Sequence, residues 1–423
     1  MQQENIQLTS IRGVLALWVV GHHWFYSIEN QQLNHFFGYA YFSVDIFFIL
    51  SGFILFKIYE KINLKNTPSF YLKRFLRIFP LHLFSLIVLT AIVIYPSFQF
   101  EFNIDYLSSI LLLQAFNEIH AINNPPSWSI SIELICYFLF PFILFSTNKV
   151  SGRSLIIQIF LVILASLLTQ QYYRGETTGL GAVFRGISGF LLGVFASKLS
   201  NRLTINNYQS NLVQFLSISL FIFCIIFSGN LGGFYKANNI VVANLAISEN
   251  ENIIIEMLKN KAPLIEIAKM MDVSDISVSR LSAITGINKM LIQKNYNNLN
   301  PDGKFYSIFN LFSNEFFQYF LPCNFLPLIA TIFIFTLHFN KGIITYALKS
   351  SILHFLGKIS FSIYLLHYLI LVLFVKLEFF KDAGIQELNL NFVYKTNIMV
   401  IVLLISSYIT YKFIEQPFRK ILK

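Results

Sequence analysis

Charged residues are scarce in this chain. They make up 12% of its 423 residues, whereas hydrophobic residues make up 55% and phenylalanine alone occurs 47 times. Soluble domains carry about 25% charged residues, so the composition excludes an ordinary soluble domain. Apolar runs of about 20 residues, the length that lets an α-helix cross a bilayer, recur along the sequence. The sequence therefore predicts an all-α integral membrane protein.

Cysteine is also rare. The three cysteines, Cys136, Cys224 and Cys323, are far apart, and each lies within or beside an apolar run. They form neither a metal-ligand spacing nor a disulfide framework, so we expect them to fill apolar space, and no metal site is predicted. The N-terminus lacks the basic segment and the small-residue cleavage site of a signal peptide. We therefore interpret the first apolar run as a retained span.

The apolar runs predict about ten transmembrane helices around a polar cavity. They lie at residues 11–28, 37–56, 76–95, 128–147, 154–169, 181–198, 212–228, 321–339, 357–375 and 397–413. With both termini in the cytoplasm, basic residues collect on the cytoplasmic side, as the positive-inside rule predicts. The cytoplasmic segments are then 57–75, 148–153, 199–211, 340–356 and 414–423.

The stretch 104–122 is less apolar, because Gln114, Asn117 and Glu118 interrupt it. Counting it as an eleventh span would invert everything downstream and place the basic C-terminus outside the cytoplasm. We therefore expect this stretch to lie in the membrane interface or to re-enter the membrane.

A polar stretch at 229–305 divides the predicted membrane domain into residues 1–228 and 306–423. Part of it, 263–281, has the pattern of a small helix-turn-helix, which would indicate DNA binding. Residues 236–308, however, hold eight Lys/Arg and seven Asp/Glu, whereas phosphates demand a basic surface. We therefore predict an inserted, helical, extracytoplasmic lobe of unknown role and no nucleic-acid partner.

The first apolar run carries ionisable residues, which are expensive in hydrocarbon and mark functional sites in membrane proteins. Arg12 lies at its start, and His22 and His23 lie near its end. On a helix, Arg12 and His23 share a face at a separation of about 16 Å, whereas His22 lies about 80° away from that line. One helix face is thus predicted to present a fixed cation and, deeper in the bilayer, a titratable imidazole.

Other ionisable side chains occur in separate spans: Asp45, Glu133 and His367. Each could act in chemistry or could hold the bundle together through an interhelical hydrogen bond. Taken together with His23, they indicate a polar cavity. On the cytoplasmic side, Arg74 and Arg77 are three residues apart and share a helix face. Two adjacent guanidinium groups suit a polyphosphate, or they anchor the helix to lipid headgroups.

Six short motifs follow one another along the chain. They are Arg12-Gly13 with His23; VDIFFILSGF at 44–53; RFLRIFP at 74–80; WSISIE at 128–133 with Tyr137 and Pro141; LGKISFSIYLLH at 356–367; and EQPFR at 415–419. In this order they resemble the acyltransferase-3 group of integral membrane acyltransferases. Members of this group O-acylate surface polysaccharides and other extracytoplasmic acceptors.

The resemblance implies an acyl-CoA donor, most simply acetyl-CoA, on the cytoplasmic side and a hydroxyl acceptor, such as a surface or lipid-linked glycan, on the other. Arg74 and Arg77 would bind the phosphates of CoA, with Arg12 at the cavity mouth. His23 would act as a general base or would itself carry the acyl group. Asp45 or Glu133 would orient its imidazole. Ser51 and His367 would line the cavity.

Two alternatives belong to other functional classes. A transporter or exporter of small metabolites or glycan precursors would also have a polar cavity, but transporters are often built from paired repeats, and no internal repeat is evident. A membrane sensor would signal through the lobe at 229–305. The high use of Phe, Ile, Asn and Lys is typical of an AT-rich bacterial genome, so we expect the bacterial cytoplasmic (inner) membrane as the location.

Overall fold

The computed structural model describes residues 5–25, 36–60, 66–94, 104–116, 124–148, 153–173, 177–227, 321–377 and 390–420. All of them belong to one compact unit, formed by Met1–Phe227 with Phe320–Lys423. The predicted lobe at 229–305 lies outside the described residues.

The described elements are all helices, and no strand occurs among these residues. In chain order they are α1 (Ile6–Phe25), the 3-10 turn η1 (Tyr39–Tyr41), α3 (Phe42–Tyr59), α4 (Thr67–Ile94), α5 (Ile104–Ile110), the 3-10 turn η3 (Pro125–Ser127), α6 (Trp128–Asn148), α7 (Arg153–Tyr173), α8 (Gly179–Ser200), α9 (Asn207–Phe227), α14 (Leu321–His338), α15 (Ile343–Ala347), α16 (Ser351–Lys358), α17 (Ser360–Lys376), α18 (Leu390–Thr410), the π-helical turn η6 (Tyr411–Glu415) and α19 (Gln416–Lys420).

Seven of the described helices are long and apolar enough to cross a membrane, and an eighth span results if α16 and α17, bent by 67°, count as one. The all-α membrane fold is thereby confirmed. Helix α1 is not among the seven, and it contains Gln7, Arg12 and two histidines. In α14 the apolar part, Phe325–His338, is shorter than a full span. The number of ten spans and the cytoplasmic termini stay predictions.

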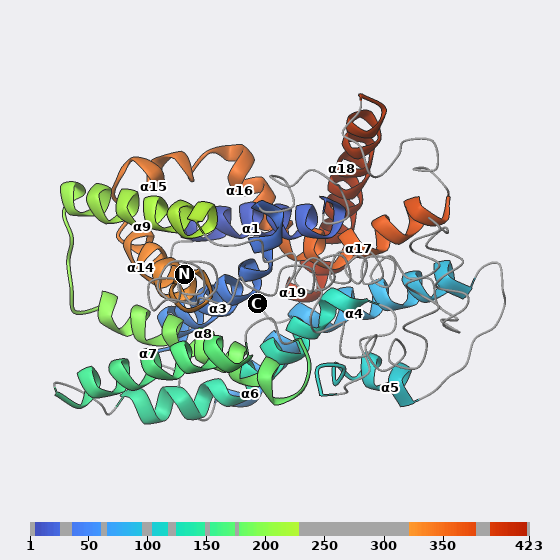
Figure 1. The fold of residues 1–423 in the computed structure, drawn as a ribbon. Coiled ribbons are helices and arrows are strands. Elements are labelled where there is room, and N and C mark those ends of the chain that lie inside the picture. The colour runs from blue at the N-terminus through green and yellow to red at the C-terminus, as the bar shows by residue number, and fades with distance from the viewer. Residues whose placement is uncertain are drawn as a thin grey trace, which may run out of the picture. The chain divides into compact units, whose positions relative to one another are not determined.

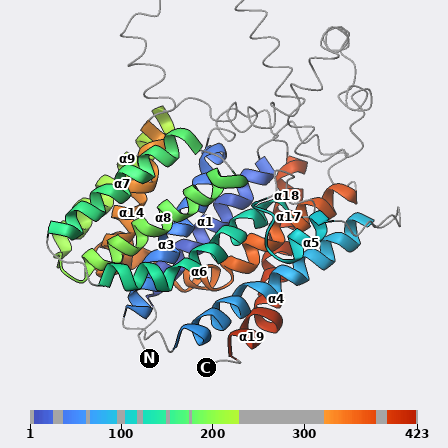
Figure 2. The ribbon, with the colours of Figure 1, turned by 90° about the horizontal axis from the view of Figure 1, so that it is seen from below.

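Helices α1, α3 and α8 lie in the middle of the bundle, with α7, α9 and α14 on one side and α4, α17, α18 and α19 on the other (Figures 1 and 2). The central pair α3 and α8 makes the most intimate contact, because small residues let two backbones approach closely. A Cβ on Gly193 would lie 1.9 Å from the carbonyl oxygen of Ile49, and one on Gly52 would lie 2.0 Å from that of Phe190. The glycine of the Ser51-Gly52-Phe53 motif is therefore required for helix packing.

We expect Gly193→Ala to destabilise the protein by about 1–3 kcal/mol, because the added methyl group would push α3 away from α8. Gly38→Ala is the matched control: Gly38 has helical backbone angles (φ −56°, ψ −36°), and a Cβ there meets nothing within 4 Å. Thermal unfolding in detergent compares the two variants. Equal melting temperatures for Gly193→Ala and the control would contradict the packing argument.

Segments predicted to be cytoplasmic contact one another at one end of the bundle. Asn201, just after α8, accepts a hydrogen bond from Lys57 and donates one to Glu60, both at the end of α3. Lys341 donates to the carbonyl oxygen of Ile205, and the backbone N–H of Ile343 donates to the side chain of Asn211. These polar loop contacts share one face, as the predicted topology requires, and the orientation of that face stays a prediction.

The interrupted stretch at 104–122 contains only the short helix α5 in its described part, 104–116. Seven residues rise about 10 Å, far short of the bilayer core of about 30 Å. After α5 the chain turns back onto η3 and α8: Gln114 donates to the carbonyl oxygen of Ser127, and the N–H of Gly179 donates to the carbonyl oxygen of Ala115. The described part of the stretch is therefore not an eleventh span.

Candidate functional site

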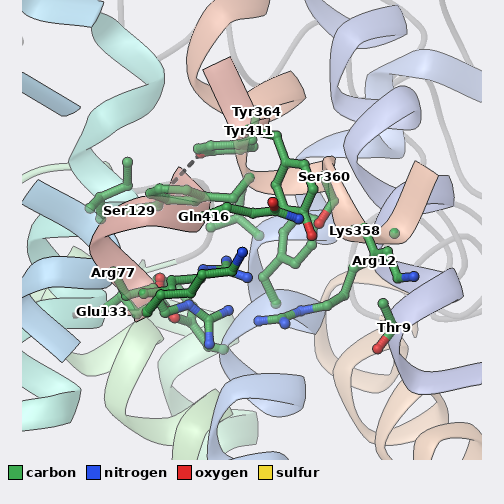
Figure 3. A pocket seen from close by; sticks show the side chains of 18 residues that line it. Thr9, Arg12, Arg77, Ser129, Glu133, Lys358, Ser360, Tyr364, Tyr411 and Gln416 are labelled. Atoms are coloured by element: carbon green, nitrogen blue, oxygen red, sulfur yellow. Dashed lines mark hydrogen bonds between the residues drawn. The ribbon is translucent and has the colours of Figure 1, made fainter. Parts of the chain in front are cut away.

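A cavity of about 440 Å³ opens where the beginning of α1 meets α3, α4, α6, α16, α17, η6 and α19. Its charged lining consists of Arg12, Arg77, Lys358, Arg419 and Lys420, with the carboxylate of Glu133. In Figure 3, Arg12 reaches across from one wall toward Arg77 and Glu133 on the opposite wall. Tyr364, Phe47, Phe48 and Phe361 supply apolar surface. So large an excess of positive charge in one cavity favours a ligand with several negative charges.

Close backbone packing places α1 beside α16. A Cβ on Gly357 would lie 2.1 Å from the carbonyl oxygen of Thr9, and one on Gly13 would lie 2.7 Å from Leu356. This contact brings the end of α16, with Lys358, next to the turn of α1 that carries Arg12. The glycines of the Arg12-Gly13 and Leu356-Gly357-Lys358 motifs thus join two parts of the cavity wall that are far apart in the sequence.

The C-terminal EQPFR motif forms another part of the wall. Glu415 is 2% exposed and pairs with Arg419 one turn later. The hydroxyl of Ser362 in α17 donates to Glu415 at 3.0 Å. Because Glu415 is fixed to α17 and binds Arg419, the arginine is positioned at the cavity.

Glu133 of α6 lines the cavity, and two hydroxyl groups donate hydrogen bonds to its carboxylate. The hydroxyl of Ser51 in α3 donates to its Oε1 at 3.1 Å, and the hydroxyl of Tyr137 donates to the same oxygen. Ser51 itself does not line the cavity within the described part of the chain, so it supports Glu133 instead. Glu133 also attracts the guanidinium groups of Arg12 and Arg77 electrostatically.

The structure separates Arg74 from Arg77. Arg77 lines the cavity, whereas the guanidinium of Arg74 donates to the Tyr59 hydroxyl at 2.9 Å and lies 5.8 Å from the centre of the Tyr137 ring. Of the two predicted phosphate-binding arginines, Arg77 therefore lines the cavity and Arg74 does not, within the described residues. Arg74 packs against the aromatic side chains of Tyr59, Phe70 and Tyr137.

His23 lies further along α1, next to a second imidazole. Its ring centre is 5.0 Å from that of His367 in α17 and 6.0 Å from that of Tyr368. His367 in turn lies 5.8 Å from Tyr364, which lines the cavity. Within the described residues neither histidine lines the cavity itself. His22 points elsewhere, as predicted: its Nδ1 donates to the carbonyl oxygen of Phe37 at 2.8 Å.

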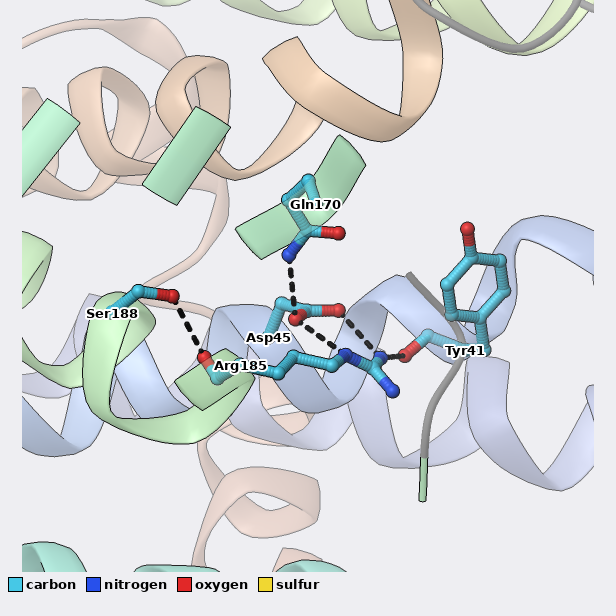
Figure 4. Close-up of polar contacts among 5 residues, drawn as sticks. All are labelled: Tyr41, Asp45, Gln170, Arg185 and Ser188. Atoms are coloured by element: carbon cyan, nitrogen blue, oxygen red, sulfur yellow. Dashed lines mark hydrogen bonds and ion pairs between the residues drawn. The ribbon is translucent and has the colours of Figure 1, made fainter. Parts of the chain in front are cut away.

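Asp45 binds Arg185 and Gln170 in the described structure, and no contact with His23 occurs among the described residues. It is 1% exposed and binds Arg185 of α8 through both oxygens, at 2.8 and 2.7 Å. Gln170 of α7 donates to it at 3.1 Å (Figure 4). Arg185 also donates to the carbonyl oxygen of Tyr41 and lies 5.2 Å from the centre of the Trp128 ring. The carboxylate thus joins α3, α7 and α8, which favours a structural role, and the catalytic role of Asp45 stays a prediction.

Residues 5–249 match the family profile of the acyltransferase domain, acyltransferase-3. The chain belongs to the acyltransferase-3 family. The resemblance inferred from the motifs is thereby confirmed, and the protein is an enzyme that transfers an acyl group. The family match also decides against the transporter.

Three curated proteins show how far this acyltransferase resembles known sequences. An uncharacterized protein of Haemophilus influenzae is 27% identical over 216 residues, which are 44% of this chain and 88% of that protein. Protein 2 in the picA locus of Rhizobium radiobacter is 40% identical over 93 residues, 20% of this chain and 44% of that protein. Acyltransferase MdmB of Streptomyces mycarofaciens is 30% identical over 165 residues, 35% of this chain and 41% of that protein. No solved structure matches.

Several site residues of the acyltransferase were missed in the sequence. Arg419 and Lys420 belong to the predicted cytoplasmic segment 414–423, whereas Lys358 and Arg185 lie in the predicted spans 357–375 and 181–198; the sequence predicted a site role for none of them. A signal existed for Arg185, because a charged residue in a spanning segment implies a partner in another span. For Arg419 and Lys420 the sequence holds no such signal, because any basic residue of a cytoplasmic segment fits the positive-inside rule whether or not it faces a cavity.

Proposed function

We propose that the protein transfers an acyl group, most simply acetyl, from cytoplasmic acyl-CoA to a hydroxyl of an extracytoplasmic acceptor, a surface or lipid-linked glycan. The observation that carries the proposal is the cavity at one end of α1, whose charged lining is five cations and one carboxylate. The opposite end of the same helix carries His23. Acyl-CoA has a polyanionic head, which suits the cationic cavity, and a long arm that ends in the acyl group, which would reach the imidazole of His23.

In this proposal, Arg12, Arg77, Arg419, Lys358 and Lys420 bind the phosphates of CoA. Arginine provides two N–H groups in a plane that fits phosphate, and lysine adds a point charge. Glu133 holds Arg12 and Arg77 in position and does not itself meet the anion. Arg74 supports the Tyr137–Glu133 contact from behind. The pantetheine arm then extends along α1, past Tyr364 and His367, toward His23.

The proposed reaction uses His23 as the general base. The acceptor hydroxyl oxygen attacks the thioester carbonyl carbon while its proton passes to an imidazole nitrogen of His23. As the carbon–sulfur bond breaks, the leaving thiolate of CoA takes that proton back from the imidazolium. No further reactant is needed. A His23 that carries the acyl group would use the same residue as nucleophile, and the two routes differ in whether an acylated His23 accumulates.

The proposal places the cavity on the cytoplasmic side of a bacterial cytoplasmic (inner) membrane. The support is the predicted excess of Lys and Arg in the segments on that face and the need for a cytoplasmic metabolite as donor. The acceptor would approach His23 from the opposite side. The bilayer is thus a structural partner, and the reaction is vectorial.

The donor site is tested with Arg12→Gln/Arg77→Gln, which removes two cavity charges. We expect the KM for acetyl-CoA to rise about tenfold or more, because each hydrogen bond to a charged group contributes roughly 1.5–3 kcal/mol, while kcat changes little. Equilibrium binding of free CoA to purified protein in nanodiscs checks the same effect without turnover. Dephospho-CoA should bind wild type more weakly than CoA because it lacks one phosphate.

Lys412→Gln is the matched control. Lys412 is an exposed residue of η6, next to cavity-lining Tyr411 but stacked on Phe413. Lys412→Gln removes one positive charge beside the cavity, where Arg12→Gln/Arg77→Gln removes two from its lining, so this control should bind CoA as wild type does. A wild-type protein that is folded yet binds neither CoA nor dephospho-CoA would rule out the proposed donor.

A further inference from the structure

The structure contains a second histidine in contact with the proposed catalytic one, and this histidine has no role in the proposed reaction so far. His367 in α17 is 0% exposed. Its ring centre lies 5.0 Å from that of His23, with the ring planes inclined by 38°. At that separation a small rotation of either ring brings facing nitrogens within hydrogen-bond range. In such a hydrogen bond one imidazole donates its N–H and the other accepts it with a bare nitrogen.

The hydrogen bond between His367 and Tyr364 determines that His367 is the acceptor toward His23. Its Nδ1 lies 2.6 Å from the backbone carbonyl oxygen of Tyr364. A carbonyl oxygen only accepts, so Nδ1 must carry the hydrogen, and in a neutral imidazole the Nε2 is then an acceptor. Within the described part of the chain this buried Nε2 has no hydrogen-bond partner. A buried acceptor without a donor costs free energy, so the site is arranged for a donor.

His23 is the neighbour best placed to be that donor. The ring centre of Tyr364 lies 5.8 Å from that of His367. The hydroxyl of Tyr364, however, already contacts the carbonyl oxygen of Pro126 and the hydroxyl of Ser129, both at 2.8 Å. His22 donates its Nδ1 hydrogen to Phe37. The imidazole of His23 has one N–H when neutral, and its ring centre lies 5.0 Å from that of His367.

We propose that Nε2 of His367 accepts the N–H of His23 and thereby fixes the tautomer of the proposed catalytic base. The other nitrogen of His23 then keeps its lone pair and points toward the acceptor hydroxyl. His367 is a positioning residue and takes the place that Asp45 and Glu133 were expected to fill. This inference rests on the proposed function, because it gives His23 the proton-accepting role.

The histidine pair also has a chemical consequence. When His23 takes up the proton of the acceptor, the imidazolium keeps its original N–H bonded to His367 and gains the second N–H on the reacting side. No proton has to leave the pair, and His367 stays neutral. The titratable groups packed against His23 in the described structure are His22, His367 and Tyr368, so no carboxylate there competes for the donor.

Two substitutions separate the acceptor function from packing. His367→Asn keeps an N–H near the Nδ1 position, facing Tyr364, but removes the acceptor at Nε2. His367→Gln carries its amide oxygen near the Nε2 position and so keeps an acceptor toward His23. We expect kcat to fall about 100-fold or more in His367→Asn, in the range of general-base effects, with an unchanged KM for acetyl-CoA. His367→Gln should retain at least a tenth of the wild-type kcat.

A second readout does not depend on turnover. Nitrogen-15 NMR of histidine-labelled protein in nanodiscs distinguishes the protonated from the bare ring nitrogen of each neutral imidazole, and the His23 signals are assigned from their absence in His23→Ala. We expect one tautomer of His23 in wild type and in His367→Gln, and a mixture in His367→Asn. His23 signals that do not change in His367→Asn would overturn the inference, as would equal losses of kcat in both variants. A wild-type protein that shows the single tautomer but never consumes acyl-CoA would refute the proposed function and leave the pairing supported.

Discussion

His23→Ala is expected to abolish acyl transfer, with a loss of roughly 100-fold to 10,000-fold in kcat, the range attributed to a positioned general base. The protein should still insert and fold, because His23 is only half-buried and its removal leaves the contact between α1 and α16 intact. Binding of free CoA should be unchanged, since the cavity cations lie at the other end of α1. The measurement is transfer of labelled acetyl from acetyl-CoA, or its hydrolysis, by purified protein in nanodiscs.

His22→Asn is the control for this experiment. It changes a histidine of the same helix, one position away, and the asparagine amide can still donate to the Phe37 carbonyl oxygen that Nδ1 of His22 contacts. It should keep most of the activity. If His23→Ala transfers acetyl as fast as wild type, His23 is neither base nor acyl carrier. An acid-quenched reaction followed by peptide mass spectrometry separates these two roles, because only a carrier adds the mass of an acyl group to His23.

Asp45→Ala is expected to destabilise the fold by about 3–5 kcal/mol, because it leaves the buried guanidinium of Arg185 without its counter-charge. Both side chains of this pair are 1% exposed. A loss of that size would appear as a large fall in melting temperature and in the yield of monodisperse protein. Asp45→Leu/Arg185→Met should recover much of the stability, since replacing a buried ion pair by apolar residues of similar volume is often neutral or stabilising.

The same double variant distinguishes a structural Asp45 from a catalytic one. If Asp45 only joins α3 to α8 and α7, folded Asp45→Leu/Arg185→Met transfers acetyl with a kcat near that of wild type. If Asp45 orients His23, the double variant is stable and inactive. A stable, inactive Asp45→Leu/Arg185→Met protein would therefore contradict the assignment made from the contacts in Figure 4.

Asp45 illustrates why local sequence could not decide the roles of buried polar residues. Its motif lies in an apolar run, and that position alone is compatible with catalysis or with interhelical bonding. The partner that decides between them, Arg185, is 140 residues away in the sequence. Ser51 is similar, since its place behind Glu133 depends on how α3 crosses α6.

The sequence by itself determined the membrane class, the helical fold, the family and the positions at which helices occur, because hydrophobic length and motif order are local properties of the chain. It also determined that Arg12 and His23 lie on one helix about three turns apart, since helix geometry fixes their spacing. Only the tertiary structure decided that Lys358 and Arg419 join Arg12 at one cavity, that Arg74 leaves it, and that His367 faces His23. These outcomes depend on close backbone contacts, such as Gly357 against Thr9, between segments hundreds of residues apart, and no local pattern encodes which faces of such segments meet.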